Sequence, residues 1–302
     1  MIPESVRIVE VGPRDGLQNE PTALGVPDRV ALIRDLAQCG LRHIEAGSFV
    51  RADRVPQMAE TDRVLARLDH NAGIGYPVLV PNMRGLENAL DAGAREIAVF
   101  AAASETFSLR NINCSIEQSL ERFSAVAEKA SSRGIRTRGY ISCVLGCPYE
   151  GAVPPGSVLE VAKRLSDMGC YEISLGDTIG TGTPNATLAL IETVASAIPL
   201  DNLAVHFHDT YGQALSNILI ALQIGVSVID SSVAGLGGCP YARGASGNVA
   251  TEDVVYMLDG MGIRHGIDLD LLITAGRTVC ALLDRPVMSR VSLARQSKSS
   301  GN

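Results

Sequence analysis

The sequence predicts an α/β fold, a (β/α)8 TIM barrel with an additional C-terminal helix. Short runs rich in β-branched residues are each followed by a longer amphipathic stretch, and this pair repeats eight times. An open doubly wound sheet commonly has only about five or six strands, so eight units favour a closed barrel. Glycines follow five of the helical stretches and precede the next strand, as left-handed helix caps do: Gly40, Gly93, Gly134, Gly169 and Gly225.

The eight expected strands are short and mostly aliphatic. In chain order they read VRIVEV at 6–11, RHIEA at 42–46, IGYPVLV at 74–80, EIAVFA at 96–101, RTRGYISCV at 136–144, YEISLG at 171–176, LAVHFH at 203–208 and SVIDSSV at 227–233. The amphipathic stretches between and after them predict helices at 27–39, 54–68, 84–92, 115–133, 157–168, 185–197, 212–224 and 250–259.

The C-terminal part of the chain exceeds the eight units. A further helix over 268–284 is expected to pack against the barrel. The segment 289–302 is rich in serine and poor in apolar residues, so we expect a flexible tail there. Because no linker divides the sequence, residues 1–302 are expected to form a single domain.

Composition excludes several classes of function. The hydrophobic fraction of 46% with 20% charged residues is that of a globular protein with a substantial core. A net charge of −7 gives no support to binding of nucleic acid or an anionic membrane, although a local basic patch for an anionic ligand remains open. No apolar stretch approaches the roughly 18 residues of a transmembrane helix.

The cysteines and the N-terminus indicate a cytoplasmic protein. The seven cysteines are scattered, and the N-terminus lacks a basic segment followed by an apolar one. We therefore expect buried thiols in a reducing compartment.

Polar residues gather where the strands are expected to end, the face that carries catalysis in such barrels. They are Arg14 and Asp15 after the first strand, Glu45 at the second, Asn82 after the third, Ser104 and Glu105 after the fourth, Arg138 and Tyr140 on the fifth, Asp177 after the sixth, His206, His208 and Asp209 at the seventh, and Cys239 after the eighth. A barrel with only a structural role gives no reason for this pattern, so it predicts an active site.

The sharpest local signal is the pair His206 and His208 at one strand end. A spacing of two places both imidazoles on the same face of a strand, where they can reach one ion. The alternative is one structural and one exposed histidine. Asp15 could complete a divalent metal site, and without a cysteine ligand Mg²⁺ or Mn²⁺ competes with Zn²⁺.

Arg14 and Glu45 are expected to act together. Glu45 ends an apolar strand, so its carboxylate needs a cationic or hydrogen-bonding partner, and Arg14 is the partner we expect. Arg14 could then stabilise an oxyanion beside the metal. The alternatives are a solvated Arg14–Asp15 pair and a Glu45 that caps a neighbouring helix.

The glycine-rich segment 235–248 matches no nucleotide-binding fingerprint, because the glycine spacing is wrong and no Lys-Ser or Lys-Thr follows. It is interpreted as a mobile lid that carries Cys239 near its tip, although a cysteine there could also be incidental. Cys143 and Cys147 are interpreted as structural.

Six motifs resemble the 3-hydroxy-3-methylglutaryl-CoA (HMG-CoA) lyase family of metal-dependent TIM-barrel enzymes, and together they span most of the chain. They are EVGPRDGLQNE at 10–20, NINC at 111–114, GCPYEG at 146–151, ISLGDTIG at 173–180, HFHDTYG at 206–212 and SVAGLGGCPY at 232–241.

The resemblance implies a ligand set and a set of catalytic residues. The divalent cation, Mg²⁺ or Mn²⁺, would be held by Asp15, His206, His208 and Asn248. Arg14 would stabilise the enolate of the departing thioester, Glu45 would orient Arg14, Cys239 would protonate the carbanion, and Asp15 or His206 would take a proton. Substrate-binding residues are expected at Arg14, Asp177, Tyr140 and Asn82, while Glu252 and Asp253 match positions of less defined role.

The implied reaction cleaves HMG-CoA to acetyl-CoA and acetoacetate, in leucine or branched-acid degradation in a bacterial cytoplasm. It requires an acyl-CoA substrate but no nicotinamide, flavin, nucleic acid or membrane partner, and a homodimer is expected. Ala46, Gly47 and the stretch 51–54 depart from the animal pattern. They leave open a related lyase for citramalyl-CoA or an isoprenoid-extended homologue. A condensing synthase and a catalytically silent CoA- or metal-binding protein are two further hypotheses.

Overall fold

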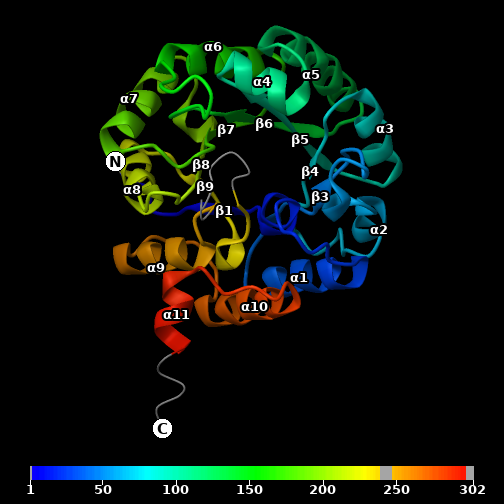
Figure 1. The fold of residues 1–302 in the computed structure, drawn as a ribbon, viewed down its shortest axis with the longest axis vertical. Coiled ribbons are helices and arrows are strands. Elements are labelled where there is room, and N and C mark those ends of the chain that lie inside the picture. The colour runs from blue at the N-terminus through cyan, green and yellow to red at the C-terminus, as the bar shows by residue number, and fades with distance from the viewer. Residues whose placement is uncertain (1, 239–246, 297–302) are drawn as a thin grey trace.

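The computed structural model describes residues 2–238 and 247–296. Within these ranges all strands belong to one parallel sheet with the order β2-β1-β9-β8-β7-β6-β5-β4-β3. The strands are β1 (Arg7–Glu10), β2 (His43–Ile44), β3 (Gly47–Ser48), β4 (Val78–Leu79), β5 (Glu96–Ala102), β6 (Arg136–Ser142), β7 (Glu172–Asp177), β8 (Leu203–Phe207) and β9 (Val228–Ser231). Figure 1 shows the sheet curled around a central axis with the helices outside it.

The sheet closes on itself through the second expected strand. Its two terminal strands, β2 and β3, are consecutive parts of one short chain segment. Between them, the Glu45 amide donates to the Glu10 carbonyl (2.9 Å) on one side, and the Ala46 amide donates to the Pro77 carbonyl (3.0 Å) on the other. The expected strand at 42–46 is therefore shared between two neighbours, and the predicted eight-stranded barrel is confirmed.

Gly47 explains how the chain passes this junction. Its φ of +157° is rare for a residue with a side chain, and a Cβ there would lie 2.6 Å from Thr61 Oγ1. The Arg29 guanidinium fills the same space and donates to the Ala59 carbonyl (2.7 Å) and to Thr61 Oγ1 (3.1 Å). The segment that carries Glu45 is thus fixed from the helix side of the barrel.

Helices cover the outer face of the sheet. They are α1 (Val26–Gln38), α2 (Thr61–Leu65), α3 (Met83–Asp91), α4 (Glu105–Ile112), α5 (Ile116–Ser131), α6 (Pro155–Asp167), α7 (Pro184–Ala195), α8 (Ala214–Ile224), α9 (Thr251–Met261), α10 (Leu269–Leu282) and α11 (Arg290–Gln296). Their aliphatic side chains, such as Leu36, Leu165 and Ile218, are fully buried against the strands. Each such burial contributes about 1.5–3 kcal/mol to folding.

Two helical regions differ from the sequence-based expectation. The helix expected at 54–68 is divided into a 3₁₀ turn, Pro56–Met58, and the short α2. Glu60, with φ of +58°, is left-handed and cannot continue a helix between them. A further helix, α4, forms where none was expected; the Ser104 hydroxyl accepts from the Phe107 amide at its start, and left-handed Asn113 ends it.

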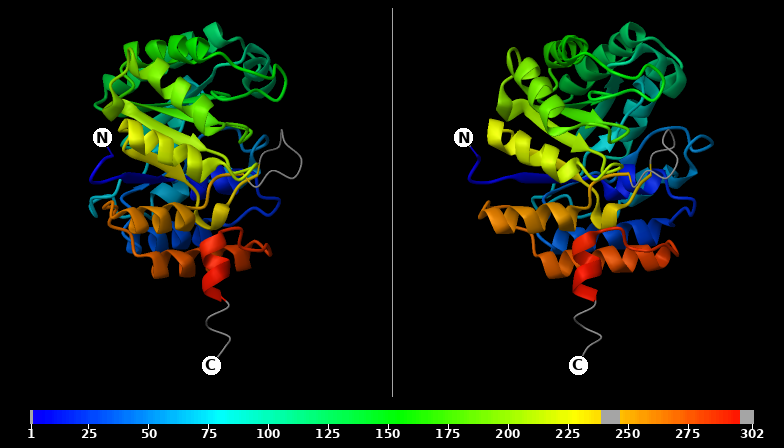
Figure 2. Two further views of the ribbon diagram at one scale, coloured as in Figure 1. Left: turned by 90° about the vertical axis from the view of Figure 1, so that its left-hand side faces the viewer. Right: turned by 60° about the vertical axis from the view of Figure 1, so that its left-hand side comes forward.

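The C-terminal region also differs in part. The expected helix at 268–284 is present as α10, which packs against α1. The expected flexible tail at 289–302 begins instead with α11, because Asp253 accepts hydrogen bonds from the Ser289 hydroxyl and the Val291 amide. Figure 2 shows α9, α10 and α11 together on one side of the barrel. Throughout the described ranges, no helix combines the length and apolar character needed to cross a bilayer.

Candidate active site

The polar residues at the strand ends do converge. β1 runs into a π-helical turn, Gly12–Gly16, which places Arg14 and Asp15 over the end of the barrel. A cavity of about 860 Å³ opens there. Among its lining residues are six of the sequence-predicted site residues: Arg14, Asp15, Asn82, Tyr140, His206 and His208.

Asp15, His206 and His208 form a candidate metal site. Their ligand atoms all lie within 4.8 Å of one another. Nδ1 of His208 is buried without a hydrogen-bond partner, while the Thr178 backbone holds the ring by another hydrogen bond. A buried imidazole nitrogen with an unused lone pair fits an ion, and two nitrogens with carboxylate oxygen suit a divalent cation that keeps open positions.

Asn248 contacts two members of this set, His208 and Asp15. Its backbone forms an isolated bridge to His208, and its amide nitrogen lies 2.9 Å from Asp15 Oδ2. Since the amide oxygen and nitrogen exchange places on rotation, Asn248 can offer an oxygen at the same position.

The electrostatic environment keeps Asp15 and His208 in their metal-binding protonation states at neutral pH. Burial would raise the pKa of Asp15, but the Arg14 guanidinium and the two histidines outweigh it and lower the pKa to about 2. Burial, followed by the neighbouring His206, lowers the pKa of His208 to about 4. At neutral pH Asp15 is therefore a carboxylate and His208 a neutral imidazole, the forms that bind metals.

Arg14 is held between two carboxylates. Its Nε and Nη2 lie 2.7 and 2.6 Å from Glu45 Oε2, and its Nη1 lies 2.6 Å from Asp15 Oδ1. Tyr140 donates to the other Glu45 oxygen at 2.9 Å. Burial would lower the pKa of Arg14, but Glu45 and Asp15 raise it above the ordinary value, so the guanidinium stays charged. The expected Arg14–Glu45 pair is confirmed.

A buried ionic network below the site was not predicted. The Arg138 guanidinium contacts both oxygens of Asp230 (2.7 and 3.0 Å) and Glu172 Oε1 (2.7 Å), and it also donates to the Tyr140 hydroxyl. Asp230 Oδ2 lies 3.3 Å from His206 Nδ1 and so orients that ring. Arg138 and Asp230 lie in the middle of two expected strands, and this position was the available signal, because charges buried in a barrel must be paired.

Buried carboxylates fix the loops that follow β1 and β9. Glu10 accepts from the Gly12 and Val233 amides (2.7 and 2.9 Å) and from the Thr251 hydroxyl (2.7 Å). Glu252 accepts from the Ala234 amide at 2.9 Å. Burial raises the pKa of Glu10 to about 7 and that of Glu252 to about 8. Glu10 lies in the first motif, but sequence reasoning gave it no role.

The remaining predicted residues occupy other positions. Asp177 accepts from the Thr181 and Gly182 amides (3.2 and 2.8 Å) and is not among the residues that line the large cavity. Burial raises its pKa to about 6. Asn82 lines the cavity and also caps α3 through the Gly85 amide, at 3.0 Å. Cys239 lies outside the described residues.

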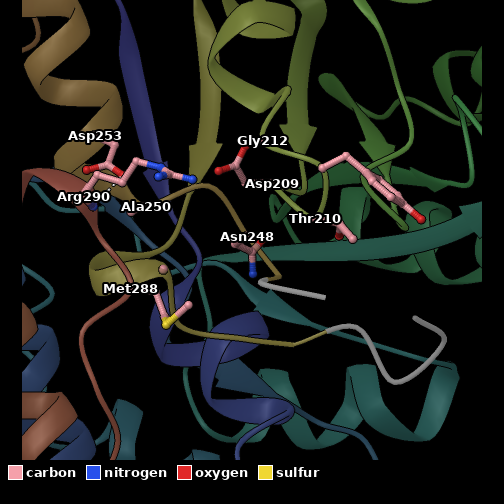
Figure 3. Close-up of a pocket in the computed structure, with 10 residues that line it drawn as sticks. Asp209, Thr210, Gly212, Asn248, Ala250, Asp253, Met288 and Arg290 are labelled. Atoms are coloured by element: carbon pink, nitrogen blue, oxygen red, sulfur yellow. Dashed lines mark hydrogen bonds between the residues drawn. The ribbon is translucent and has the colours of Figure 1, made fainter. Parts of the chain in front are cut away.

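A second, smaller cavity of about 380 Å³ borders Asn248. Figure 3 shows Asp253 and Arg290 at one end of it and Thr210 at the other, with Asn248 between them. Asp253 accepts from the Arg290 amide at 3.1 Å, so the start of α11 forms part of the wall.

Comparison with known proteins gives consistent results. Residues 5–279 match the family model described as HMGL-like. The chain is 57% identical over 298 residues to a Pseudomonas aeruginosa 3-hydroxy-3-isohexenylglutaryl-CoA/hydroxy-methylglutaryl-CoA lyase, covering 99% of both chains. It is also 57% identical over 293 residues to the mitochondrial hydroxymethylglutaryl-CoA lyase of Rattus norvegicus, covering 97% of this chain and 90% of the relative.

Solved structures agree with the fold. The crystal structure of hydroxymethylglutaryl-CoA lyase from Pseudomonas aeruginosa superposes with a TM-score of 0.96 at 57% identity, covering 98% of this chain and 99% of that one. An Acinetobacter baumannii HMG-CoA lyase in complex with coenzyme A and 3-methylmalate gives a TM-score of 0.92 at 36% identity, covering 96% and 95%.

Proposed function

The chain belongs to the HMGL-like family, and we propose that it is a divalent-metal-dependent lyase that cleaves HMG-CoA to acetyl-CoA and acetoacetate. The observation that carries this proposal is the shared cavity. Asp15, His206, His208 and Arg14 line it together, Arg14 contacts Asp15, and the fully buried Glu45 holds Arg14 in place. Carbon–carbon cleavage needs both a site for the alcohol oxygen and a cation for the departing enolate.

The residues of the site suggest how the substrate alcohol is deprotonated and the C2–C3 bond is broken. A divalent cation held by Asp15, His206, His208 and Asn248 would acidify the tertiary alcohol of the substrate. The hydroxyl proton would pass to Asp15 or His206, and the electrons of that O–H bond would form the ketone as the C2–C3 bond breaks.

The second half of the reaction concerns the acetyl-CoA fragment. The electron pair of the broken bond would become a thioester enolate, which Arg14 would stabilise from its position fixed by Glu45. Cys239 would then protonate the carbanion. Tyr140 supports Glu45, and Asn82 is proposed as a contact to the substrate at the cavity wall. Asp177 is proposed to act through the loop that it holds.

The test is a product assay with purified protein, HMG-CoA and added divalent metal. Acetyl-CoA and acetoacetate should appear in equal amounts. The Asp15→Asn variant, which keeps the side-chain size, should release neither at a comparable rate. Intact HMG-CoA after incubation with folded, metal-loaded protein would contradict the proposal.

The acyl substituent at C3 needs its own measurement. The two lyases from Pseudomonas aeruginosa and Rattus norvegicus are equally similar to this chain, and the first is named for two substrates. Values of kcat/KM for HMG-CoA, citramalyl-CoA and an isoprenoid-extended homologue would rank these thioesters. We expect HMG-CoA to be the best substrate.

Four further assignments belong to the same proposal. The cation is proposed to be Mg²⁺ or Mn²⁺, because the donor set lacks a cysteine. The chain is proposed to form one domain and to assemble as a homodimer. A reducing cytoplasm is proposed because the six described cysteines are all free and buried.

A further inference from the structure

Asp230 is a buried aspartate of β9 that contacts the candidate metal site from beneath it. It is not among the residues that line either cavity. One of its oxygens, Oδ2, nevertheless lies 3.3 Å from Nδ1 of His206. Because Asp230 does not face the cavity itself, any influence that it has on the site is exerted through His206.

The Asp230 carboxylate is fixed in place by Arg138. Nη2 of Arg138 lies 2.7 Å from Oδ1, and Nη1 lies 3.0 Å from Oδ2. The Arg138 Nε is bound to Glu172 Oε1 at 2.7 Å, so the guanidinium cannot turn without breaking a second ion pair. A two-point contact of this kind fixes the plane of a carboxylate as well as its position.

The contacts of Oδ2 decide where His206 carries its hydrogen. The Ser174 hydroxyl donates to Oδ2 at 2.8 Å, and His206 Nδ1 is the other neighbour besides Arg138. An aspartate paired with a guanidinium in this way is ionised and can only accept hydrogen bonds. The hydrogen of the imidazole therefore belongs on Nδ1, which leaves the lone pair on Nε2.

Nε2 of His206 lies on the metal side of the ring. It is 3.8 Å from Oδ2 of Asp15, within the group of ligand atoms that also includes His208. The Tyr140 ring contacts the same imidazole at nearly a right angle, with ring centroids 5.9 Å apart. The ring is thus held by two neighbours, with its lone pair directed towards Asp15.

We propose that Asp230 is a positioning residue that makes Nε2 of His206 the metal-binding nitrogen, by holding the ring in its Nδ1–H form. This inference deepens the proposed function and rests on its metal site. Arg138 extends the effect to the other half of the site, because it also donates to the Tyr140 hydroxyl, which in turn donates to Glu45. One buried ion pair therefore supports both the metal ligand and the carboxylate that holds the catalytic arginine.

Replacement of Asp230 by asparagine should reverse the choice of nitrogen. Among the described residues, Oδ1 contacts only the Arg138 guanidinium, which cannot accept, so the amide oxygen should stay there. At the Oδ2 position the Ser174 hydroxyl and His206 Nδ1 can both accept, so the amide nitrogen should take it. Donation to Nδ1 would move the ring hydrogen to Nε2 and block the lone pair that faces Asp15.

The first test measures Mn²⁺ affinity by equilibrium dialysis for the wild type, Asp230→Asn and Glu172→Gln. Glu172→Gln is the matched control, because Glu172 is equally buried and also binds Arg138. Within the part of the chain that the structure describes, its other ion pair is with Arg7 and none is with His206. A loss of metal affinity that came only from a disturbed Arg138 would appear in both variants.

We expect Asp230→Asn to bind Mn²⁺ about 10- to 100-fold more weakly than the wild type, and Glu172→Gln to stay within about twofold. Equal Mn²⁺ affinities in the two variants, whether both unchanged or both weakened, would overturn the proposal. A wild type that binds no Mn²⁺ would overturn it as well.

The second test needs no folded Asp230 variant. Long-range proton–nitrogen NMR of the metal-free wild type with ¹⁵N-labelled histidine, at slightly alkaline pH, shows which ring nitrogen carries the hydrogen, and a His206→Gln sample identifies the His206 signals. We expect hydrogen on Nδ1. Hydrogen on Nε2 would overturn the proposal.

Failure of the proposed function is distinguishable from failure of this inference, because neither test uses turnover. A wild type that binds Mn²⁺ but leaves HMG-CoA intact would refute the proposed reaction. The affinity difference between Asp230→Asn and Glu172→Gln and the wild-type NMR signals would still decide the role of Asp230.

Discussion

At the scale of single residues, the proposed catalytic role of Arg14 rests on how its hydrogen bonds are divided. Nε and Nη2 are committed to Glu45, and Nη1 is committed to Asp15. The guanidinium is therefore held rigidly beside the candidate metal ligands before any substrate arrives. Preorganised charge of this kind is worth most where charge develops during the reaction.

Replacing Arg14 tests this role directly. We expect Arg14→Met to lower kcat for HMG-CoA cleavage by about 10³-fold or more, while KM changes much less, because the lost interaction belongs to the transition state. Steady-state kinetics measure the effect, and Arg84→Met, at an exposed arginine outside the cavity lining, is the control. A change confined to KM would assign Arg14 to ground-state binding instead.

Metal binding should depend on the partnerless nitrogen of His208. We expect His208→Ala to weaken Mn²⁺ binding by at least about 100-fold, as followed by equilibrium dialysis with metal analysis. His265→Ala, at a histidine that contacts Asp259 and does not line the cavity, should bind like the wild type. Unchanged stoichiometry and affinity in His208→Ala would remove His208 from the ligand set.

Sequence reasoning identified most of this site because the residues occur in short local patterns. Asp15 beside Arg14, and two histidines spaced by two, are visible without a structure. The interaction of Glu45 with Arg14 follows from the need to pair a carboxylate at an apolar strand end. The Arg138–Asp230 contact joins residues 92 positions apart, and no local sequence pattern predicts which charged residues pair.

At the scale of elements, α9 connects the C-terminal helices to the loop after β9. Glu252 at its start accepts from the Ala234 amide, and the adjacent Asp253 caps α11. The sequence placed α9 and α10 within a few residues because their apolar periodicity is regular. It did not place α11, since the stabilising acceptor lies on a different helix.

The raised pKa of Glu252 predicts a pH dependence of stability. A carboxyl whose folded pKa is about 8, against an ordinary value of 4.5, contributes stability below 4.5 that is lost as pH rises towards 8. The free energy of unfolding should fall across that window by up to about 1.4 kcal/mol per pH unit from this group, and Glu252→Gln should reduce the slope. Urea unfolding at pH 5 to 8 measures it; an identical slope in Glu252→Gln would contradict the assignment.

The strands themselves depend on the buried arginine of β6. Removing Arg138 would leave Asp230 and Glu172 without it inside the barrel, so Arg138→Met should lower the free energy of unfolding by about 3–5 kcal/mol. Arg136→Met, on the same strand but with a 60% exposed side chain, should cost no more than about 1 kcal/mol. Urea unfolding measures both variants. If the free energy of unfolding falls equally in the two, the network has no special structural role.

At the scale of the whole molecule, barrel closure brings these residues together. Asp15, Glu45, His206 and Asn248 come from distant parts of the chain and meet because β1 pairs with both β2 and β9, and β9 pairs with β8. The repeat of strand and helix was sufficient to predict that closure. The division of the second strand was not predictable, because it depends on which neighbour each amide meets.

We propose that the residues gathered at this end of the barrel perform metal-dependent carbon–carbon cleavage. The most direct test of this proposal is acetoacetate release from HMG-CoA by metal-stripped protein, before and after addition of Mg²⁺ or Mn²⁺. We predict negligible release from the stripped protein and recovery by at least about 100-fold with either cation. Full activity without metal, or none with metal bound, would contradict this claim.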